Sequence, residues 1–217
     1  MKEKEQILKL RKELSQHNHS YYVLDKPTIT DFEFDIKLKR LQVLEINYPQ
    51  LFDSSSPTQR VGGEVTKNFE TIVHTQRMYS LDNSYSKEDL MDWEVRLRKM
   101  VDGPIEFTCE LKYDGASISL TYENGLLVQA LTRGDGTQGD NVTANIKTIK
   151  SVPLKLRGNY PSKFEIRGEI VLPFVGFRAL NEEKIAAGEE PYKNPRNTAS
   201  GSLKLQDSTE VARRPLE

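Results

Sequence analysis

Apolar side chains recur at helical spacing over the first fifty residues of the chain. The first stripe consists of Ile7, Leu10, Leu14 and Tyr21. It predicts an amphipathic helix from Lys4 to Tyr21, which Pro27 brings to an end. A second helix is predicted to begin at Thr30, because Glu33 stands three residues later, as in a capping box.

The second helix carries its own apolar stripe, formed by Phe34, Leu38, Leu41 and Leu44. Pro49 is expected to stop this helix. The turn-forming sequence FDSSSPTQRVGG then predicts a linker at about residues 52–63. The first part of the chain, residues 1–63 with the linker, is therefore predicted to be a small all-helical domain.

Beyond the linker the hydrophobic pattern changes. Ser86 is predicted to cap a helix. The core-facing residues of that helix would be Leu90, Trp93, Leu97 and Val101. From Glu106 the pattern alternates like a β-strand, and Asn124-Gly125 predicts a hairpin turn, since both central residues of a type I′ turn need positive φ. With a strand in KFEIRGEIVL and a helix closed by Gly188, residues 64–217 are predicted to be an α+β domain with an antiparallel sheet.

Composition and charge narrow the class of protein. At 36% hydrophobic and 29% charged residues, the chain is typical of a folded globular protein rather than a disordered one. The beginning of the chain has no apolar stretch typical of a signal peptide, and no segment is long enough to span a membrane. The single cysteine, Cys109, excludes an intrachain disulfide and a cysteine zinc cluster. We expect a cytoplasmic monomer without membrane contact, and the net charge of −1 gives no global sign of a nucleic-acid partner.

Three ionisable residues would share one face of the strand predicted in CELKYDG. Glu110, Lys112 and Asp114 alternate with apolar positions, a pattern that a solvent-exposed strand face also produces. A lysine acts as a nucleophile only when its amine is neutral, which requires burial or cationic neighbours. Arg133 is a candidate neighbour, whereas Glu110 would favour the charged ammonium.

Two further stretches carry candidate chemistry in the second domain. In TRGDGTQGDNVTANI the glycines can bring backbone N–H groups close to a phosphate, and Asp140 can cap the helix that follows. In EIRGEI, Glu165, Arg167 and Glu169 share a strand face, while Ile166 and Ile170 would point inward. This face suits either a cross-strand ion pair or a carboxylate presented to a metal ion or a ribose.

Acidic and aromatic residues gather in the helical domain. Asp31 and Asp35 are four residues apart in a helix, close to Tyr21 and Tyr22 of the preceding helix. Acidic residues in a first turn are usual because of the helix dipole. Two carboxylates beside aromatic rings would also suit a flat cationic ring.

Together these stretches resemble the bacterial NAD-dependent DNA ligases over nearly the whole chain. ELKYDG is similar to the KxDG motif of nucleotidyltransferases, which ATP-dependent ligases and capping enzymes share. More specific are YYVLDKPTITDFEFD, SPTQRVGG, MYSLDNSY, LTRGDGTQGD, EIRGEI and NPRNTASGSLKLQD. The resemblance implies a helical domain that binds nicotinamide mononucleotide (NMN), followed by an ATP-grasp-like nucleotidyltransferase domain that is truncated at its C-terminal end.

The resemblance also implies a reaction and a set of site residues. Lys112 would attack NAD, release NMN and become lysyl-AMP, and the AMP would pass to the 5′-phosphate of a DNA nick, which is then sealed. The adenosine would lie near Glu110, Ser80 and Leu81. Asp114 and Arg133 would support the ribose and phosphates, and Glu169 would lie near the sugar and Mg²⁺. The cofactor set is completed by Tyr21, Tyr22, Asp31, Phe32, Glu33, Phe34, Asp35 and Gly115.

The chain departs from the family pattern in three respects. Phe34 stands where the family usually has tyrosine, which removes a hydroxyl contact and is expected to weaken binding. Lys204 stands where arginine is usual, and lysine cannot make a bidentate phosphate contact. The chain also ends before the OB-fold, zinc module and other later domains of the family, so we interpret it as a piece of a longer protein whose zinc site lies in the missing part.

Two alternatives to a ligase front end remain. Another KxDG nucleotidyltransferase, such as an RNA ligase or capping enzyme, would have no nicotinamide to hold with Tyr21 and Asp35. A non-catalytic NAD-binding module is the second alternative, because the later lysines that contact phosphates in the family are missing from this chain.

Overall fold

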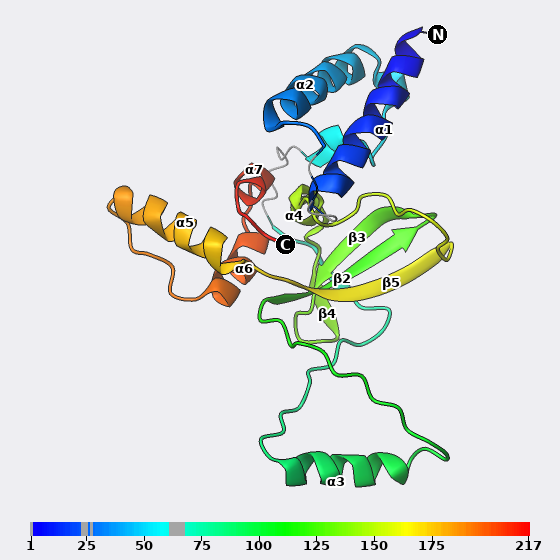
Figure 1. The fold of residues 1–217 in the computed structure, drawn as a ribbon, viewed down its shortest axis with the longest axis vertical. Helices are drawn as coiled ribbons and strands as arrows, with labels where there is room; N and C mark the ends of the chain where they lie inside the picture. The colour runs from blue at the N-terminus through cyan, green and yellow to red at the C-terminus, as the bar shows by residue number, and fades with distance from the viewer. Residues whose placement is uncertain (1, 23–25, 27, 61–67) are drawn as a thin grey trace.

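The computed structural model describes residues 2–22, 26, 28–60 and 68–217, and these fold into a helical part and an α+β part (Figure 1). The α-helices are α1 (Lys2–Tyr22), α2 (Asp31–Asn47), α3 (Lys87–Arg98), α4 (Thr143–Thr148), α5 (Phe174–Ala186), α6 (Pro195–Leu203) and α7 (Ser208–Ala212). The strands are β1 (Thr71–Val73), β2 (Ala116–Glu123), β3 (Leu126–Thr132), β4 (Gln138–Asp140) and β5 (Lys163–Ile170). Two short 3₁₀ helices are η1 (Pro49–Leu51) and η2 (Pro57–Arg60). The α+β class predicted from the sequence is confirmed.

The helical part is built on the packing of α1 against α2. Its buried core consists of Ile7, Leu10, Leu14 and Leu41. These residues belong to the two stripes predicted from the sequence, so both amphipathic helices are confirmed. Thr30 caps α2 as expected: its hydroxyl accepts the backbone N–H of Glu33, and the Glu33 carboxylate accepts the backbone N–H of Thr30 at 2.9 Å.

The segment from residue 52 to residue 60, predicted as part of a linker, is folded against α2. Ser56 and Thr58 are buried, and both hydroxyls donate to the carboxylate of Glu45, Ser56 at 2.7 Å. Arg11 of α1 reaches the same carboxylate from Nε at 2.6 Å. The linker prediction is therefore wrong for residues 52–60, because turn-forming Ser and Thr also satisfy a buried acid. Its remainder, residues 61–63, lies outside the described residues.

An antiparallel sheet in the order β3–β2–β5 forms the centre of the α+β part. The predicted hairpin joins β2 and β3, with φ of 50° at Asn124 and 79° at Gly125. Ile118 and Tyr122 project from β2 into a core that α4, α6 and α7 complete. The Tyr122 hydroxyl donates to the carbonyl oxygen of Pro153 at 2.8 Å, so the buried ring keeps its polar end satisfied. A second sheet pairs β1 with β4.

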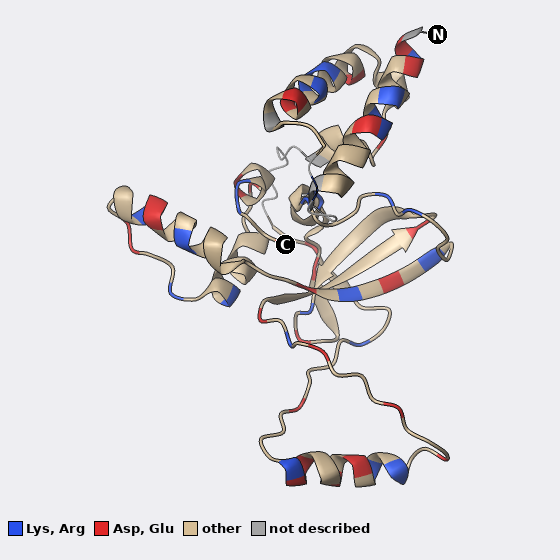
Figure 2. Cartoon of the chain, in the orientation of Figure 1, with Lys and Arg blue, Asp and Glu red and all other residues tan. Residues whose placement is uncertain are grey.

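The outer strand β5 departs from its predicted pattern. Basic and acidic residues alternate along it, as expected (Figure 2). Ile170 is buried, but Ile166 is 51% exposed although the alternation predicts that it points inward. Ile166 lies on the same face as Ile170 and opposite Leu120 of β2. Because β5 is an edge strand of the sheet, the elements that bury Ile170 leave Ile166 at the uncovered margin of this face.

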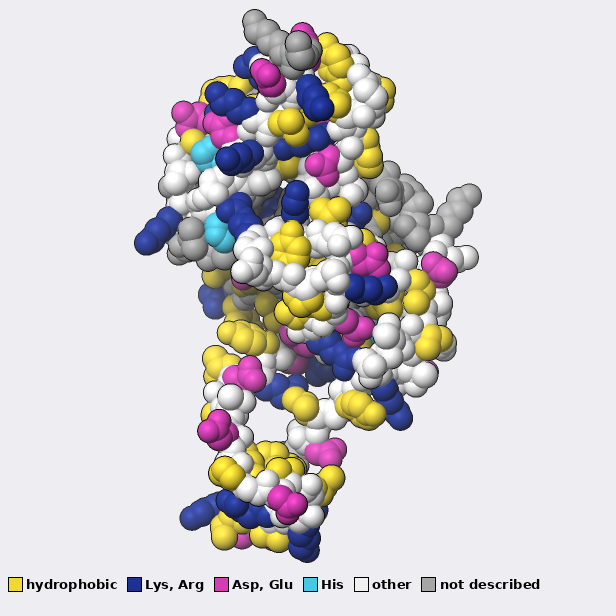
Figure 3. All heavy atoms as spheres, turned by 90° about the vertical axis from the view of Figure 1, so that its right-hand side faces the viewer, with side chains coloured by type: hydrophobic (Ala, Val, Ile, Leu, Met, Phe, Trp, Pro, Cys, Tyr) yellow, Lys and Arg dark blue, Asp and Glu magenta, His cyan; other side chains and the backbone are white. Residues whose placement is uncertain are grey.

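Helix α3 is capped by Ser86 as predicted, but it does not pack on the core. It lies apart from the two sheets, at the end of two extended connections (Figure 1), and no residue of the helix is buried. Its predicted core face is therefore solvent-exposed, with Leu90 at 52% and Trp93 at 41% (Figure 3). Within the described residues, no helix is both long and apolar enough to cross a membrane.

Candidate nucleotide-binding site

The segment that contains Lys112 is an extended connection rather than a strand. Residues 104–114 form no ladder with any described strand, and Glu110, Lys112 and Asp114 are all exposed. The predicted strand is therefore wrong here, because alternation identifies a strand only where a neighbouring strand supplies hydrogen bonds. Asp114 forms an ion pair with Arg196 at 3.3 Å. No described residue forms a hydrogen bond or ion pair with Lys112, so the expected proximity of Arg133 is not established.

Gly115 fixes the end of this segment against β5. A Cβ atom at this position would lie 2.1 Å from the backbone oxygen of Ile170, so only glycine fits without a shift of the backbone. The Gly115 N–H donates to Oε1 of Glu169 at 3.2 Å, and the Ser117 hydroxyl donates to Oε2 at 2.8 Å. Glu169 is thereby held beside Gly115, which stands three residues after Lys112 in the chain.

Backbone hydrogen bonds join residues 74–80 to residues 133–139, and each of these segments contains a predicted nucleotide contact. The backbone N–H of His74 donates to the carbonyl oxygen of Thr137 at 2.9 Å, and that of Met78 donates to Gly136 at 2.8 Å. These bonds connect residues 74–80 to the glycine-rich loop 133–139. The guanidinium of Arg133 then reaches the hydroxyl of Ser80 at 3.4 Å. The structure thus brings together Ser80 and Arg133, which the sequence analysis could place only by resemblance.

His74 contributes to this connection, and the sequence analysis missed it. Its ring is buried, and Nε2 donates to the carbonyl oxygen of Arg133 at 3.1 Å. Because a carbonyl only accepts, Nε2 carries the proton in the neutral ring. Nδ1 is buried and has no hydrogen-bond partner among the described residues. A single histidine after a short apolar run carries no recognisable signal, so only the structure identifies it.

The glycine-rich loop is stabilised by its own side chains. The carboxylate of Asp135 accepts the backbone N–H groups of Gln138 and Thr137, and these bonds hold the pKa of Asp135 below its usual value. Asp140 does not cap α4, in contrast to the prediction: it belongs to β4 and pairs with Lys204 at 2.7 Å.

The hydrogen bonds at the start of α4 come from the residue next to Asp140. Asn141 accepts the backbone N–H of Thr143 at 3.2 Å, which satisfies a free donor at the beginning of the helix. The capping prediction is therefore wrong. Asp140 is held in the β1–β4 ladder, and the N-cap position of α4 is Val142, whose side chain makes no capping hydrogen bond.

Arg167 of β5 links the main sheet to the segment that precedes Ser80. Its guanidinium donates to the backbone carbonyls of Gln76 at 2.6 Å and Arg77 at 2.9 Å. It also pairs with Glu165 at 3.2 Å along the same strand, rather than across to the next strand as the ion-pair interpretation supposed.

In the helical part, the structure describes the surroundings of some of the predicted nicotinamide residues. Phe32 and Asp35 are exposed on α2, and Phe34 packs against the helical core. The carboxylate of Glu33 accepts the hydrogen bonds of Thr30 that cap α2. The side chains of Tyr21, Tyr22 and Asp31 lie outside the described part of the structure.

Both the helical part and the α+β part of the chain match families of known proteins. Residues 66–217 match the NAD-dependent DNA ligase adenylation domain, and residues 1–62 match the DNA ligase-like, N-terminal NAD⁺-binding domain. The chain belongs to the NAD-dependent DNA ligase family. It is 70% identical to a DNA ligase of Christiangramia forsetii over the whole chain, and 69% identical to one of Flavobacterium johnsoniae over 98% of the chain. A DNA ligase of Bacteroides fragilis is 54% identical over 99% of the chain.

The chain spans about a third of the length of these ligases, 33%, 32% and 32% respectively. The resemblance inferred from the sequence motifs is thus confirmed at the level of the family. Among the described residues, no three His, Cys, Asp or Glu side chains form a metal-binding group.

Proposed function

We propose that this chain is the NAD-recognising and adenylating part of a NAD-dependent DNA ligase, with Lys112 as the nucleophile. The observation that carries the proposal is the family match over both parts of the chain, together with the KxDG segment that ends on the anchored Gly115. Residues 1–63 would form the NMN-binding domain, and residues 64–217 the first part of the adenylation domain.

The proposed reaction is a transfer of AMP to an amine. The neutral amine of Lys112 attacks the α-phosphorus of NAD, a P–N bond forms, and the P–O bond to NMN breaks with the electron pair leaving on NMN. The nitrogen loses one proton to solvent as the phosphoramidate forms. Arg133 supports this step, because it is a fixed cation beside Ser80 at the glycine-rich loop.

Glu169 is the residue that would hold Mg²⁺ in this proposal. It presents a half-buried carboxylate whose orientation is fixed by Gly115 and Ser117. Mg²⁺ commonly binds to one or two carboxylates and completes its shell with water and substrate phosphates, so a single acid fits the group. When bound, the ion neutralises charge on the phosphates. A 5′-phosphate in nicked DNA is the proposed AMP acceptor, and the protein is proposed to act in the cytoplasm as a monomer.

The test is the intact mass of the protein after incubation with NAD and Mg²⁺. A species heavier by one adenylyl group is expected to form readily on a full-length ligase and at most slowly on this chain, and it should be absent from Lys112→Ala. Lys99→Ala, which removes an exposed lysine at the end of α3, is the matched control and should still form the adduct. An adduct that persists in Lys112→Ala would overturn the assignment of the nucleophile.

A non-catalytic NAD-binding role for this part of the protein is the second candidate. It is favoured by the exposure of Lys112 and by the absence of strand pairing for residues 104–114 within the described structure. NAD binding by calorimetry without any adduct, even after long incubation, would support this candidate. In either case Asp35→Ala should weaken the binding of NAD but not of AMP, because Asp35 is proposed to face the nicotinamide half.

A further inference from the structure

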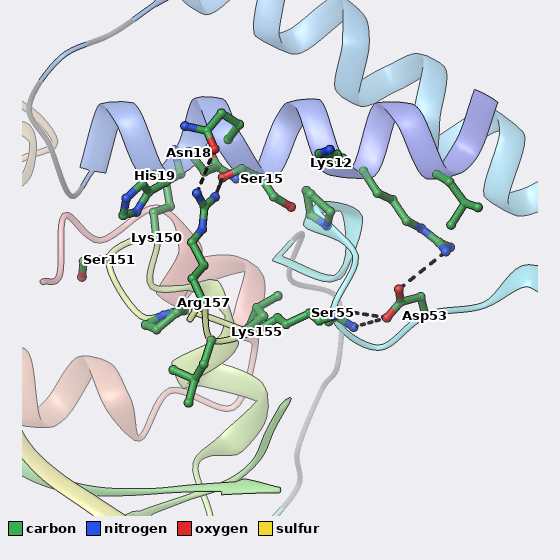
Figure 4. Close-up of a pocket in the computed structure, with 17 residues that line it drawn as sticks. Lys12, Ser15, Asn18, His19, Asp53, Ser55, Lys150, Ser151, Lys155 and Arg157 are labelled. Atoms are coloured by element: carbon green, nitrogen blue, oxygen red, sulfur yellow. Dashed lines mark hydrogen bonds and ion pairs between the residues drawn. The ribbon is translucent and has the colours of Figure 1, made fainter. Parts of the chain in front are cut away.

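A cleft of about 750 Å³ separates the helical part from the α+β part. One wall is the face of α1 from Leu8 to His19, and the opposite wall is the segment 150–157 between α4 and β5 (Figure 4). The turn at residues 53–57 closes one side. The volume is in the range of pockets that enclose small organic ligands.

The walls of this cleft carry mainly positive charge. The basic residues that line it are Arg11, Lys12, Lys150, Lys155 and Arg157, with His19 beside them. Among the lining residues that the structure describes, Asp53 is the single acidic one. The described lining residues thus carry five cations against one carboxylate, in a chain whose net charge is −1.

Several of these charges are not cancelled by neighbouring acids. Arg11 is neutralised, since it pairs with Glu45 at 2.6 Å and lies 3.6 Å from Asp53. Within the described parts of the chain, in contrast, no carboxylate forms an ion pair with Lys12 or Lys155. A cleft that holds unneutralised cations favours an anionic occupant.

Arg157 fixes the two walls relative to each other. Its guanidinium donates to Oε1 of Gln16 at 2.8 Å and to the backbone oxygen of Ser15 at 2.7 Å (Figure 4). Both acceptors are neutral, so these bonds cross the cleft without cancelling the charge of Arg157.

The pKa of Asp53 is consistent with a positive field in the cleft. Burial would raise this pKa, but hydrogen bonds from Ser55 and the positive charges of Arg11 and Lys155 outweigh that effect and lower it. The two cations come from opposite walls, so the carboxylate lies in a field set by both parts of the molecule.

Uncharged residues form the rest of the lining. The apolar ones are Leu8, Pro57, Pro153, Leu154 and Leu156, and the polar ones are Ser15, Gln16, Asn18, Ser55 and Ser151. An apolar wall beside cations suits a ligand that combines a flat or apolar body with an anionic group. The cleft does not suit the nicotinamide ring of NAD, which is itself cationic, and the exposed Asp35 of α2 is not among its lining residues.

We propose that this cleft is a second ligand site, which binds a phosphate monoester carried on a flat or apolar body. Lys12 and Lys155 hold the phosphate from opposite walls, and the apolar lining covers the body. A ligand bound there contacts α1 and the segment 150–157 together, so it ties the helical part to the α+β part. This site is independent of the proposed reaction at Lys112.

The test uses phenyl phosphate as the probe, with binding to the whole chain measured by calorimetry. Wild type should bind phenyl phosphate and should bind phenol far more weakly. Lys12→Ala and Lys155→Ala should each weaken binding about threefold to fivefold, the effect of losing one partly exposed charge pair. Raising the salt concentration should weaken binding in wild type more than in either variant.

Two matched variants separate this site from other sources of binding. Lys9→Ala removes an exposed lysine of α1 outside the cleft, and Lys112→Ala removes the proposed nucleophile; both should bind like wild type. Equal losses in Lys9→Ala and Lys12→Ala, or a loss only in Lys112→Ala, would overturn the proposal. Competition by a 5′-phosphorylated oligonucleotide, but not by its unphosphorylated form, would identify a nucleic-acid end as the source of the phosphate, whereas its failure would indicate a small metabolite.

Discussion

The carboxylate of Glu45 is the point where α1, α2 and the segment 52–60 meet, so its removal should destabilise the helical part more than any surface change. It accepts hydrogen bonds from Arg11, Ser56 and Thr58. The side chains of Arg11 and Glu45 are only 11% and 12% exposed. Glu45→Ala would therefore leave a largely buried guanidinium without its main partner.

The loss of stability expected in Glu45→Ala depends on which interactions Arg11 retains without Glu45. Removing one partner of a buried ion pair costs about 3–5 kcal/mol. Arg11 retains a hydrogen bond to the backbone oxygen of Leu51 at 2.7 Å and the carboxylate of Asp53 at 3.6 Å. The lower end, about 3 kcal/mol, is therefore expected. For a unit of this size such a loss corresponds to a fall in melting temperature of about 12–24 °C.

The chain offers a matched control between the same two helices. Glu13 of α1 pairs with Lys37 of α2, but their side chains are 34% and 31% exposed. Glu13→Ala should cost less than about 1 kcal/mol, because water screens an exposed pair. The measurement is denaturant unfolding followed by far-ultraviolet circular dichroism, with Glu45→Gln expected between wild type and Glu45→Ala. Equal losses in Glu45→Ala and Glu13→Ala would show that burial of the pair does not determine its contribution.

Three further outcomes are expected. Gly115→Ala should abolish the adenylyl adduct detected by mass while leaving the circular dichroism spectrum nearly unchanged, since its Cβ would clash with β5 beside the proposed nucleophile; an unchanged adduct yield would contradict this reasoning. Tyr122→Phe should lower the unfolding free energy by about 1 kcal/mol in urea titrations, through loss of one buried hydrogen bond, and no change would mean that water replaces it. The pKa of Glu13 is lowered by its hydrogen bond with Lys37, so this pair should stabilise the fold above the unfolded pKa and lose that effect as pH falls through the lowered folded pKa. The difference in stability between wild type and Glu13→Ala should therefore shrink in acid, and a constant difference would argue against the ion pair.

The features that the sequence predicted correctly are those whose causes are local. The cap at Thr30 needs only Glu33 three residues later, and the hairpin needs only Asn124-Gly125 between two apolar runs. The helical stripes also succeeded, because each helix of the pair carries the apolar face that covers the other.

The failures lie where structure depends on a distant partner. Residues 104–114 have the alternation of a strand, and α3 has the stripe of a core helix, yet neither finds a surface to cover among the described residues. A pattern specifies which face is apolar, but burial depends on what stands opposite it.

The candidate site also depends on contacts between residues that are distant in the chain, which the sequence does not reveal. Ser80 and Arg133 are 53 residues apart in the chain, and what joins them is backbone hydrogen bonding between two loops, together with the buried ring of His74. Every residue except proline has the same backbone donor and acceptor, so the sequence contains no pattern that predicts such a connection. Family resemblance could name Ser80 and Arg133 because they stand in the motifs MYSLDNSY and LTRGDGTQGD. It could not name His74, whose contribution is to hold the backbone carbonyl of Arg133 in place, and such positioning residues have to be found from coordinates.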